Sequence, residues 1–228
     1  MHCHRISPYF NTDYIMRSDY PVDKREFTRS RTIRIGGWLL FAGILLSACV
    51  QPLLNSERIE QQFGSYGVDV LKSTVSRRIT NLYSIKGERK TCRTLALVIF
   101  ANPSHAAIAT EHRQITAGGS IGAVFKENGW TIHKTNLHIG LVTVTAATSL
   151  AASLMNIQLP AQLAMHVYRF QLQRGPERID YAIITELHHP DYLSVARLKS
   201  LYNEFPAEFL SEPSLAAINA DARRTLLE

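Results

Sequence analysis

Residues 92–101, with the sequence CRTLALVIFA, constrain the fold more than any other segment of this chain. The segment is rich in β-branched and other apolar residues, and it lacks the polar-apolar alternation of a half-exposed strand. Such a run is typical of a strand buried on both faces. We therefore expect residues 92–101 to form a central strand of a sheet. Cys92, inside this strand, is then a small buried residue and a poor nucleophile.

Weaker patterns surround this strand and predict the other elements. Alternating apolar residues predict strands at 68–74, 77–85, 130–144, 163–173 and 178–187. Helices are expected after residue 51, at 105–117, 121–127 and 146–155, and again near Asp191, with Ser104 and Asp191 as caps. The segments 86–88 and 174–177 contain glycine and predict hairpin turns. No repeat interrupts this order, so we expect an α+β fold, an antiparallel sheet with flanking helices.

Residues 24–49 have the features of an export signal. Five Lys or Arg residues between Lys24 and Arg34 precede the uncharged apolar stretch 35–46. This order describes a secretory signal, and the stretch is shorter than the roughly 20 residues of a spanning helix. The sequence Leu46-Ser47-Ala48-Cys49 resembles the bacterial lipobox, which implies cleavage before Cys49 and its acylation. The alternative is an uncleaved signal anchor with an incidental cysteine.

This organisation predicts four segments and a location. Residues 1–48 are the signal segment, of which 1–15 are not translated if Met16 is the true start. Residues 49–56 form a lipidated tether, 57–205 the α+β domain and 206–228 a helical C-terminal tail. The lipid bilayer is then a partner through Cys49. Val50 follows the cysteine where enterobacterial sorting to the inner membrane uses aspartate, which favours the periplasmic face of the outer membrane.

The charge balance argues against nucleic acid as a partner. The chain has 25 Lys and Arg against 19 Asp and Glu, a formal net charge of +6. Seven of these basic and four of these acidic residues lie in segment 1–48, which leaves 18 against 15 afterwards. No long basic run remains there, so a phosphate-binding surface has little support.

Several segments, taken in order, resemble the chorismate lyase-like fold over residues 57–193. These are the entry at 58–62, the hairpin at 77–101, the helix-to-strand passage at 119–140 and the strand at 181–187. The chain departs from typical lyases in the length of 92–121 and in an insertion at 146–160. The resemblance implies a buried cavity for a small carboxylate ligand. It also implies ligand contacts from an arginine of the first hairpin, a glutamate of the last strand and a backbone amide at the start of the helix expected at 121–127.

Carried over to this chain, these contacts are Arg78 or its neighbour Arg77, Glu186, and the backbone amide of Ile121. The two arginines point to opposite faces of a strand, and register alone does not choose between them. Glu186 alternates with Ile184 and so faces either the core or, as the alternative, solvent at a strand end. His189 is a further candidate at the mouth of the cavity.

The sequence favours no metal and no cofactor. Neighbouring histidines such as His188 and His189 point to opposite faces of a strand and rarely share one ion. The preferred function is a lipid-anchored envelope protein whose chorismate lyase-like domain binds a small anionic or aromatic ligand. One alternative is a scaffold for protein–protein interaction without a ligand site. The second is a lyase-type enzyme, and whether any reaction is catalysed stays open.

Overall fold

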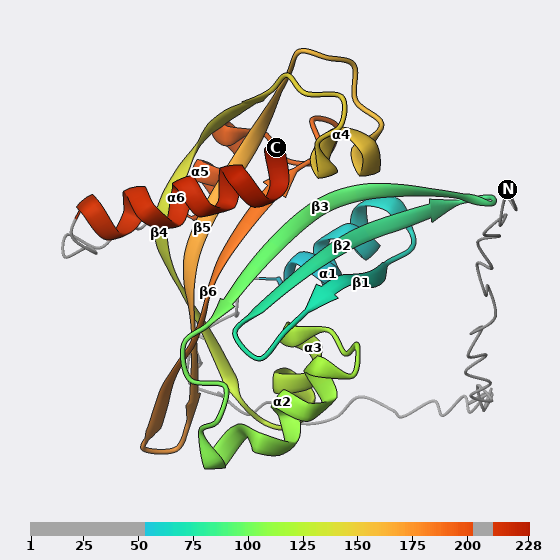
Figure 1. The fold of residues 1–228 in the computed structure, drawn as a ribbon. Helices are drawn as coiled ribbons and strands as arrows, with labels where there is room; N and C mark the ends of the chain where they lie inside the picture. The colour runs from blue at the N-terminus through green and yellow to red at the C-terminus, as the bar shows by residue number, and fades with distance from the viewer. Residues whose placement is uncertain (1–52, 203–211) are drawn as a thin grey trace, which may run out of the picture. The chain divides into compact units, whose positions relative to one another are not determined.

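The strand predicted to be central is β3 (Arg89–Phe100), which lies inside an antiparallel sheet (Figure 1). The computed structural model describes residues 53–202 and 212–228. Within these ranges the sheet has six strands in the order β1-β2-β3-β6-β5-β4. The remaining strands are β1 (Gly67–Ser73), β2 (Arg77–Lys86), β4 (Thr131–Val144), β5 (Ala161–Arg174) and β6 (Glu177–His188).

Helices flank this sheet, so the predicted α+β class is confirmed. They are α1 (Asn55–Phe63), the short 3-10 helix η1 (Ala106–Ile108), α2 (Ala109–Thr116), α3 (Ile121–Glu127), α4 (Leu150–Met155), α5 (Val195–Leu201) and α6 (Glu212–Leu227). The bounds of α3 agree with the predicted 121–127, and the other elements differ from prediction mainly at their ends.

The hairpins β2–β3 and β5–β6 form the middle of the sheet, and the pairing of β3 with β6 joins them. Gly87 turns the chain between β2 and β3 with φ 60°, and Gly175 turns it between β5 and β6 with φ 59°. Glycine adopts this left-handed conformation without the steric penalty of a Cβ atom. Both predicted hairpin turns are confirmed. The antiparallel pairing of β3 with β6 then places each hairpin against the other.

Both faces of the sheet are covered, which explains the continuous apolar run in β3. Leu95 and Leu97 pack on one face, in a cluster that includes residues of α4 and α6. Ala96 and Val98 point to the opposite face, where α2 and α3 add to the core. In Figure 1 α4 and α6 lie in front of the sheet and α1 lies behind it.

The predicted helix caps are wrong at two positions. His105 caps η1 by accepting a hydrogen bond from the amide of Ala107, and Ser104 has no such role. Ser194 caps α5 by accepting from the amide of Arg197. Asp191 does not cap α5, because the chain first makes a turn in which the amide of Tyr192 donates to the carbonyl of His189 at 2.9 Å.

The two ends of the described chain pack against the sheet. Helix α1 begins at Asn55, within the segment expected to be a tether, and the Asn55 side chain is buried. Helix α6, within the expected tail, contributes Ala222 and Leu226 to the core. The predicted signal segment and Cys49 lie outside the described residues. No helix in the described ranges is long and apolar enough to cross a membrane.

The central position of β3 makes a testable prediction about stability. Leu97 is 1% exposed, whereas Leu141 on β4 is 54% exposed. Replacing Leu97 with alanine leaves a cavity in the core and should lower the free energy of unfolding by about 2–5 kcal/mol. Leu141→Ala is the matched control and should change it by less than about 0.5 kcal/mol. Urea denaturation of both variants checks this, and equal effects would contradict the assigned position of β3.

Candidate functional site

Arg78 is a buried cation on β2 without a carboxylate partner in the described part of the chain. The residue is 1% exposed, and one terminal nitrogen donates to the carbonyls of Ile115 at 2.8 Å and Gly119 at 2.9 Å. Its Nε has no hydrogen-bond partner. Burial lowers the pKa of Arg78, but an arginine remains charged in proteins. A charge in this position is expensive unless an anion compensates for it.

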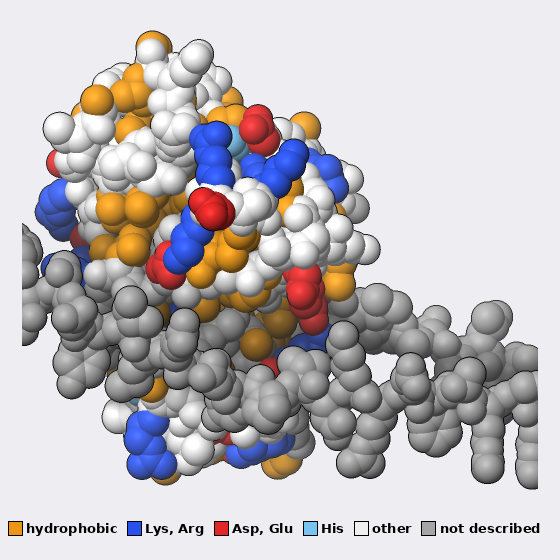
Figure 2. Space-filling model, turned by 90° about the vertical axis from the view of Figure 1, so that its right-hand side faces the viewer, with side chains coloured by type: hydrophobic (Ala, Val, Ile, Leu, Met, Phe, Trp, Pro, Cys, Tyr) orange, Lys and Arg blue, Asp and Glu red, His pale blue; other side chains and the backbone are white. Residues whose placement is uncertain are grey.

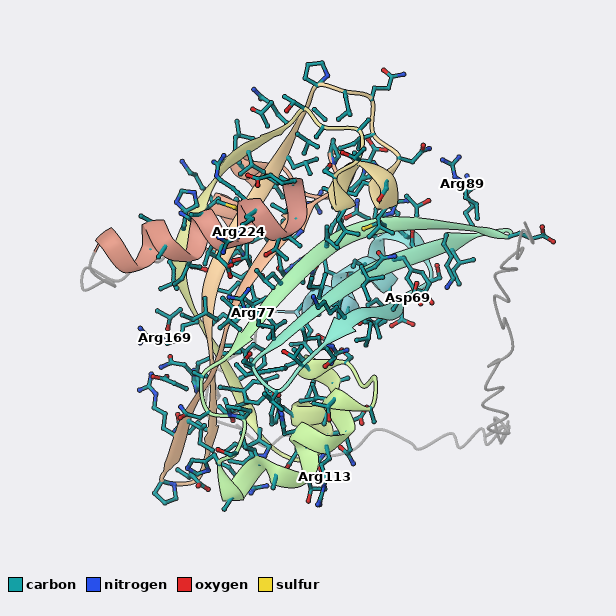
Figure 3. The ribbon with its side chains drawn as sticks, viewed as in Figure 1. Asp69, Arg77, Arg89, Arg113, Arg169 and Arg224 are labelled. Atoms are coloured by element: carbon teal, nitrogen blue, oxygen red, sulfur yellow. The ribbon has the colours of Figure 1, made fainter. Side chains whose placement is uncertain are left out.

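Arg77 points to the opposite face of β2 and has a partner there. Its guanidinium forms an ion pair with Asp221 of α6 at 3.0 Å, and Arg224 of the same helix also binds Asp221 at 2.9 Å. Figure 3 shows Arg77 on β2 and Arg224 on α6. The choice that the sequence left open is therefore resolved in geometry. Arg78 faces the interior, and Arg77 attaches α6 to the sheet.

Arg78 and Glu186 line one cavity between the sheet and the helices α1 and α3. The cavity has a volume of about 70 Å³, which is room for about five water molecules. Glu186 is 5% exposed, so the alternative of a solvent-facing strand end is wrong. Ile121, at the start of α3, also lines the cavity. The remaining walls include Asn55, Tyr66, Thr80, Ala96, Val98, Lys134, Tyr168, Phe170 and Ile184.

Glu186 is held by donors from other elements. Its Oε1 accepts hydrogen bonds from Asn55 Nδ2 and from the Tyr168 hydroxyl, both at 3.1 Å. Burial raises the pKa of Tyr168 well above its ordinary value, so its hydroxyl keeps the proton that it donates. Asn55 is fixed in turn by the Tyr192 hydroxyl, which donates to Asn55 Oδ1 at 2.6 Å. The carboxylate orientation is thus determined by side chains of α1, β5 and the segment after β6.

Two buried histidines lie beside Glu186. His166 Nε2 is 2.8 Å from Asn136 Oδ1, and His188 Nδ1 is 3.0 Å from Thr94 Oγ1. The other nitrogen of each ring has no hydrogen-bond partner. Burial lowers the pKa of both imidazoles, that of His188 to about 4, so both rings are neutral near pH 7. Each orphaned buried nitrogen costs about 1–3 kcal/mol if nothing binds it.

The structure does not bring every predicted residue to the cavity. His189 is absent from its walls and instead accepts a hydrogen bond at Nδ1 from the amide of Asp191. Sequence reasoning missed two residues beside Glu186. His166 lies in one buried group with Glu186 and His188, and Asn55 donates a hydrogen bond to Glu186. Asn55 lay in the presumed tether. His166 could have been found only from the register of β5 against β6.

No protein-family model matches the chain, and no curated protein matches it by sequence. Among solved structures, the chain is similar to the C-terminal domain of Yurk from Bacillus subtilis, with a TM-score of 0.34 and 12% sequence identity. The overlap covers 63% of this chain and 86% of that domain. A similarity of this extent does not assign a fold family.

Cys92 of β3 lies outside the candidate site, and the reactivity of its thiol tests whether β3 is buried in solution. The thiol is 2% exposed, and burial raises its pKa to about 12. Because the thiolate is the reactive form, Cys92 should resist maleimide in the native protein and react fully in urea. Peptide mass spectrometry after labelling measures this residue separately from the other cysteines. Rapid native labelling at Cys92 would show that β3 opens readily.

Proposed function

We propose that this chain is a lipid-anchored envelope protein whose chorismate lyase-like domain binds a small carboxylate in the cavity beside Arg78. The observation that carries the proposal is the buried guanidinium of Arg78, whose Nε has no hydrogen-bond partner. Guanidinium groups recognise carboxylates through paired N–H donors. A bound carboxylate would supply the missing charge and acceptor together.

The cavity limits the size and the charge of this ligand. Space for about five water molecules accommodates a carboxylate group and a few further non-hydrogen atoms of a ligand. Phe170, Val98 and Ile184 provide apolar contacts for its body. Lys134 and Glu186 line the same cavity with opposite charges, which leaves the charge of Arg78 for one anionic group of the ligand. We therefore infer a monocarboxylate with an apolar or hydrogen-bond-donating remainder.

The scaffold alternative has less support. It predicted a packed interior without a cavity, together with an exposed apolar patch. The large exposed apolar side chains of the described residues come from separate elements, such as Leu71 on β1, Leu141 on β4 and Leu201 on α5. On the face in Figure 2, basic and acidic side chains lie among the hydrophobic ones. Apolar residues scattered in this way are common on soluble surfaces.

The lyase-type alternative required Arg78 and Glu186 on one site, and they do line the same cavity. No second observation favours a reaction, since Glu186 Oε1 is already occupied by two protein donors. We therefore propose binding of a ligand and no reaction.

The role of Arg78 is testable with benzoate as the probe. Arg78→Met removes the charge and should weaken benzoate binding by about 10–100-fold, the contribution of a hydrogen bond to a charged group. Arg77→Met is the matched control on the opposite face and should bind benzoate like the wild type. Isothermal titration calorimetry measures both variants after circular dichroism has shown that they fold.

Two further results decide this test. Succinamate and succinate have the same shape but differ by one charge, and succinamate should bind more tightly because one carboxylate already balances Arg78, Lys134 and Glu186 together. Equal loss in both arginine variants, or no benzoate binding by the wild type, would contradict the proposed site.

The lipid anchor is tested separately. Replacing Cys49 with alanine removes the thiol that accepts the lipid, so the protein should no longer incorporate radiolabelled palmitate in growing bacteria. Cys92→Ala is the control, and it should be labelled as the wild type is. A wild type that takes up no palmitate, or a Cys49→Ala protein labelled like the wild type, would contradict lipidation at Cys49 and favour the uncleaved signal anchor.

A further inference from the structure

The sheet register places three metal-ligating side chains on one face. His166 of β5 is directly opposite Glu186 of β6, and His188 follows Glu186 by two residues on the same strand. Side chains at these positions point to the same side of a sheet. One ligand atom from each residue lies within 4.8 Å of the other two, and all three residues are buried.

Each histidine of this group has one ring nitrogen without a hydrogen-bond partner among the described residues. His188 Nε2 is 3.7 Å from Glu186 Oε2, which is too long for a hydrogen bond. The Nδ1 of His166 and the Nε2 of His188 have no hydrogen-bond partner, although the two residues are 0% and 1% exposed. Buried polar atoms normally have partners, so two unpartnered nitrogens in one group indicate a place where a ligand can bind.

The surrounding contacts are those that orient metal ligands. Asn136 Oδ1 lies 2.8 Å from the second nitrogen of His166, and Thr94 Oγ1 lies 3.0 Å from that of His188. Asn55 and Tyr168 hold Glu186 through Oε1. Hydrogen bonds on the far side of each ligand fix its tautomer and direction in metal sites.

We propose that His166, Glu186 and His188 bind one divalent transition-metal ion. Two imidazoles and one carboxylate are a ligand set used for zinc and for iron(II), with positions left open to other ligands. The separations need to shrink only modestly, since ligand atoms of a tetrahedral zinc site are about 3.4 Å apart. Glu186 belongs both to this site and to the walls of the cavity beside Arg78, so the two sites adjoin. Arg78 itself is not one of the proposed metal ligands.

The charged residues around the proposed site indicate what kind of additional ligand would complete the coordination of the metal ion. Two cations lie close to this group, since Arg58 donates to the Tyr202 hydroxyl, whose ring stacks on His166, and Lys134 lines the adjacent cavity with Glu186. A divalent ion would leave this region with excess positive charge. An anion at an open coordination position would reduce that excess, so we expect such a ligand to bind the metal from the side of the cavity.

Zinc binding by the full chain tests the site. After removal of metal with a chelator, the wild type should bind Zn²⁺ and show a higher melting temperature that EDTA reverses. His188→Gln and His166→Gln should each lower the affinity for Zn²⁺ by about 100-fold or more. His189→Gln is the matched control, because His189 neighbours His188 in sequence but lies outside the cluster, and it should bind like the wild type.

A measurement on the wild type guards against variants that fail to fold. X-ray absorption of the zinc-loaded protein should show nitrogen and oxygen ligands with the multiple scattering of two imidazoles. Zinc binding that is unchanged in both histidine variants, or absent from the wild type, would overturn the proposal. Arg78→Met should retain zinc binding, so failure of the metal site and failure of the carboxylate site are distinguished.

Discussion

The pairing of β3 with β6 is the contact on which the candidate site depends. It joins the hairpin that carries Arg78 to the hairpin that carries Glu186. Val98 lies opposite both Arg78 and Ile184, and Ala96 lies opposite Glu186. Because cross-strand partners point to the same side of a sheet, this register brings the two charged residues to one face. A shift by one residue would send one of them to the other face.

The two faces of the sheet differ in the polar groups that they bury. The face opposite the cavity is filled by leucine, valine and methionine side chains against α4 and α6. The cavity face instead buries Arg78 at one position and the cluster of His166, Glu186 and His188 at another. Buried charges and orphaned nitrogens reduce stability, and packing elsewhere must offset this loss. This concentration on one face supports the proposed binding site, since buried groups with shifted pKa values cluster at functional sites.

Local signals made much of the fold predictable, whereas the site depended on register. Glycine turns and apolar periodicity are short-range features, and they placed both hairpins and α3 correctly. The β5–β6 pairing shifts by one residue between Phe170 and Gln171. Without this bulge, counting from the turn would place Met165 opposite Glu186 and turn His166 to the other face. Neither the bulge nor the burial of Asn55 leaves a recognisable sequence signal.

We propose that the buried charge of Arg78 serves to bind an anionic ligand, and a crystal structure of the protein grown with benzoate tests this role. We expect benzoate in the cavity, with its carboxylate oxygens within hydrogen-bond distance of the Arg78 guanidinium. An empty cavity in which Arg78 is paired with a carboxylate of the protein itself would contradict it.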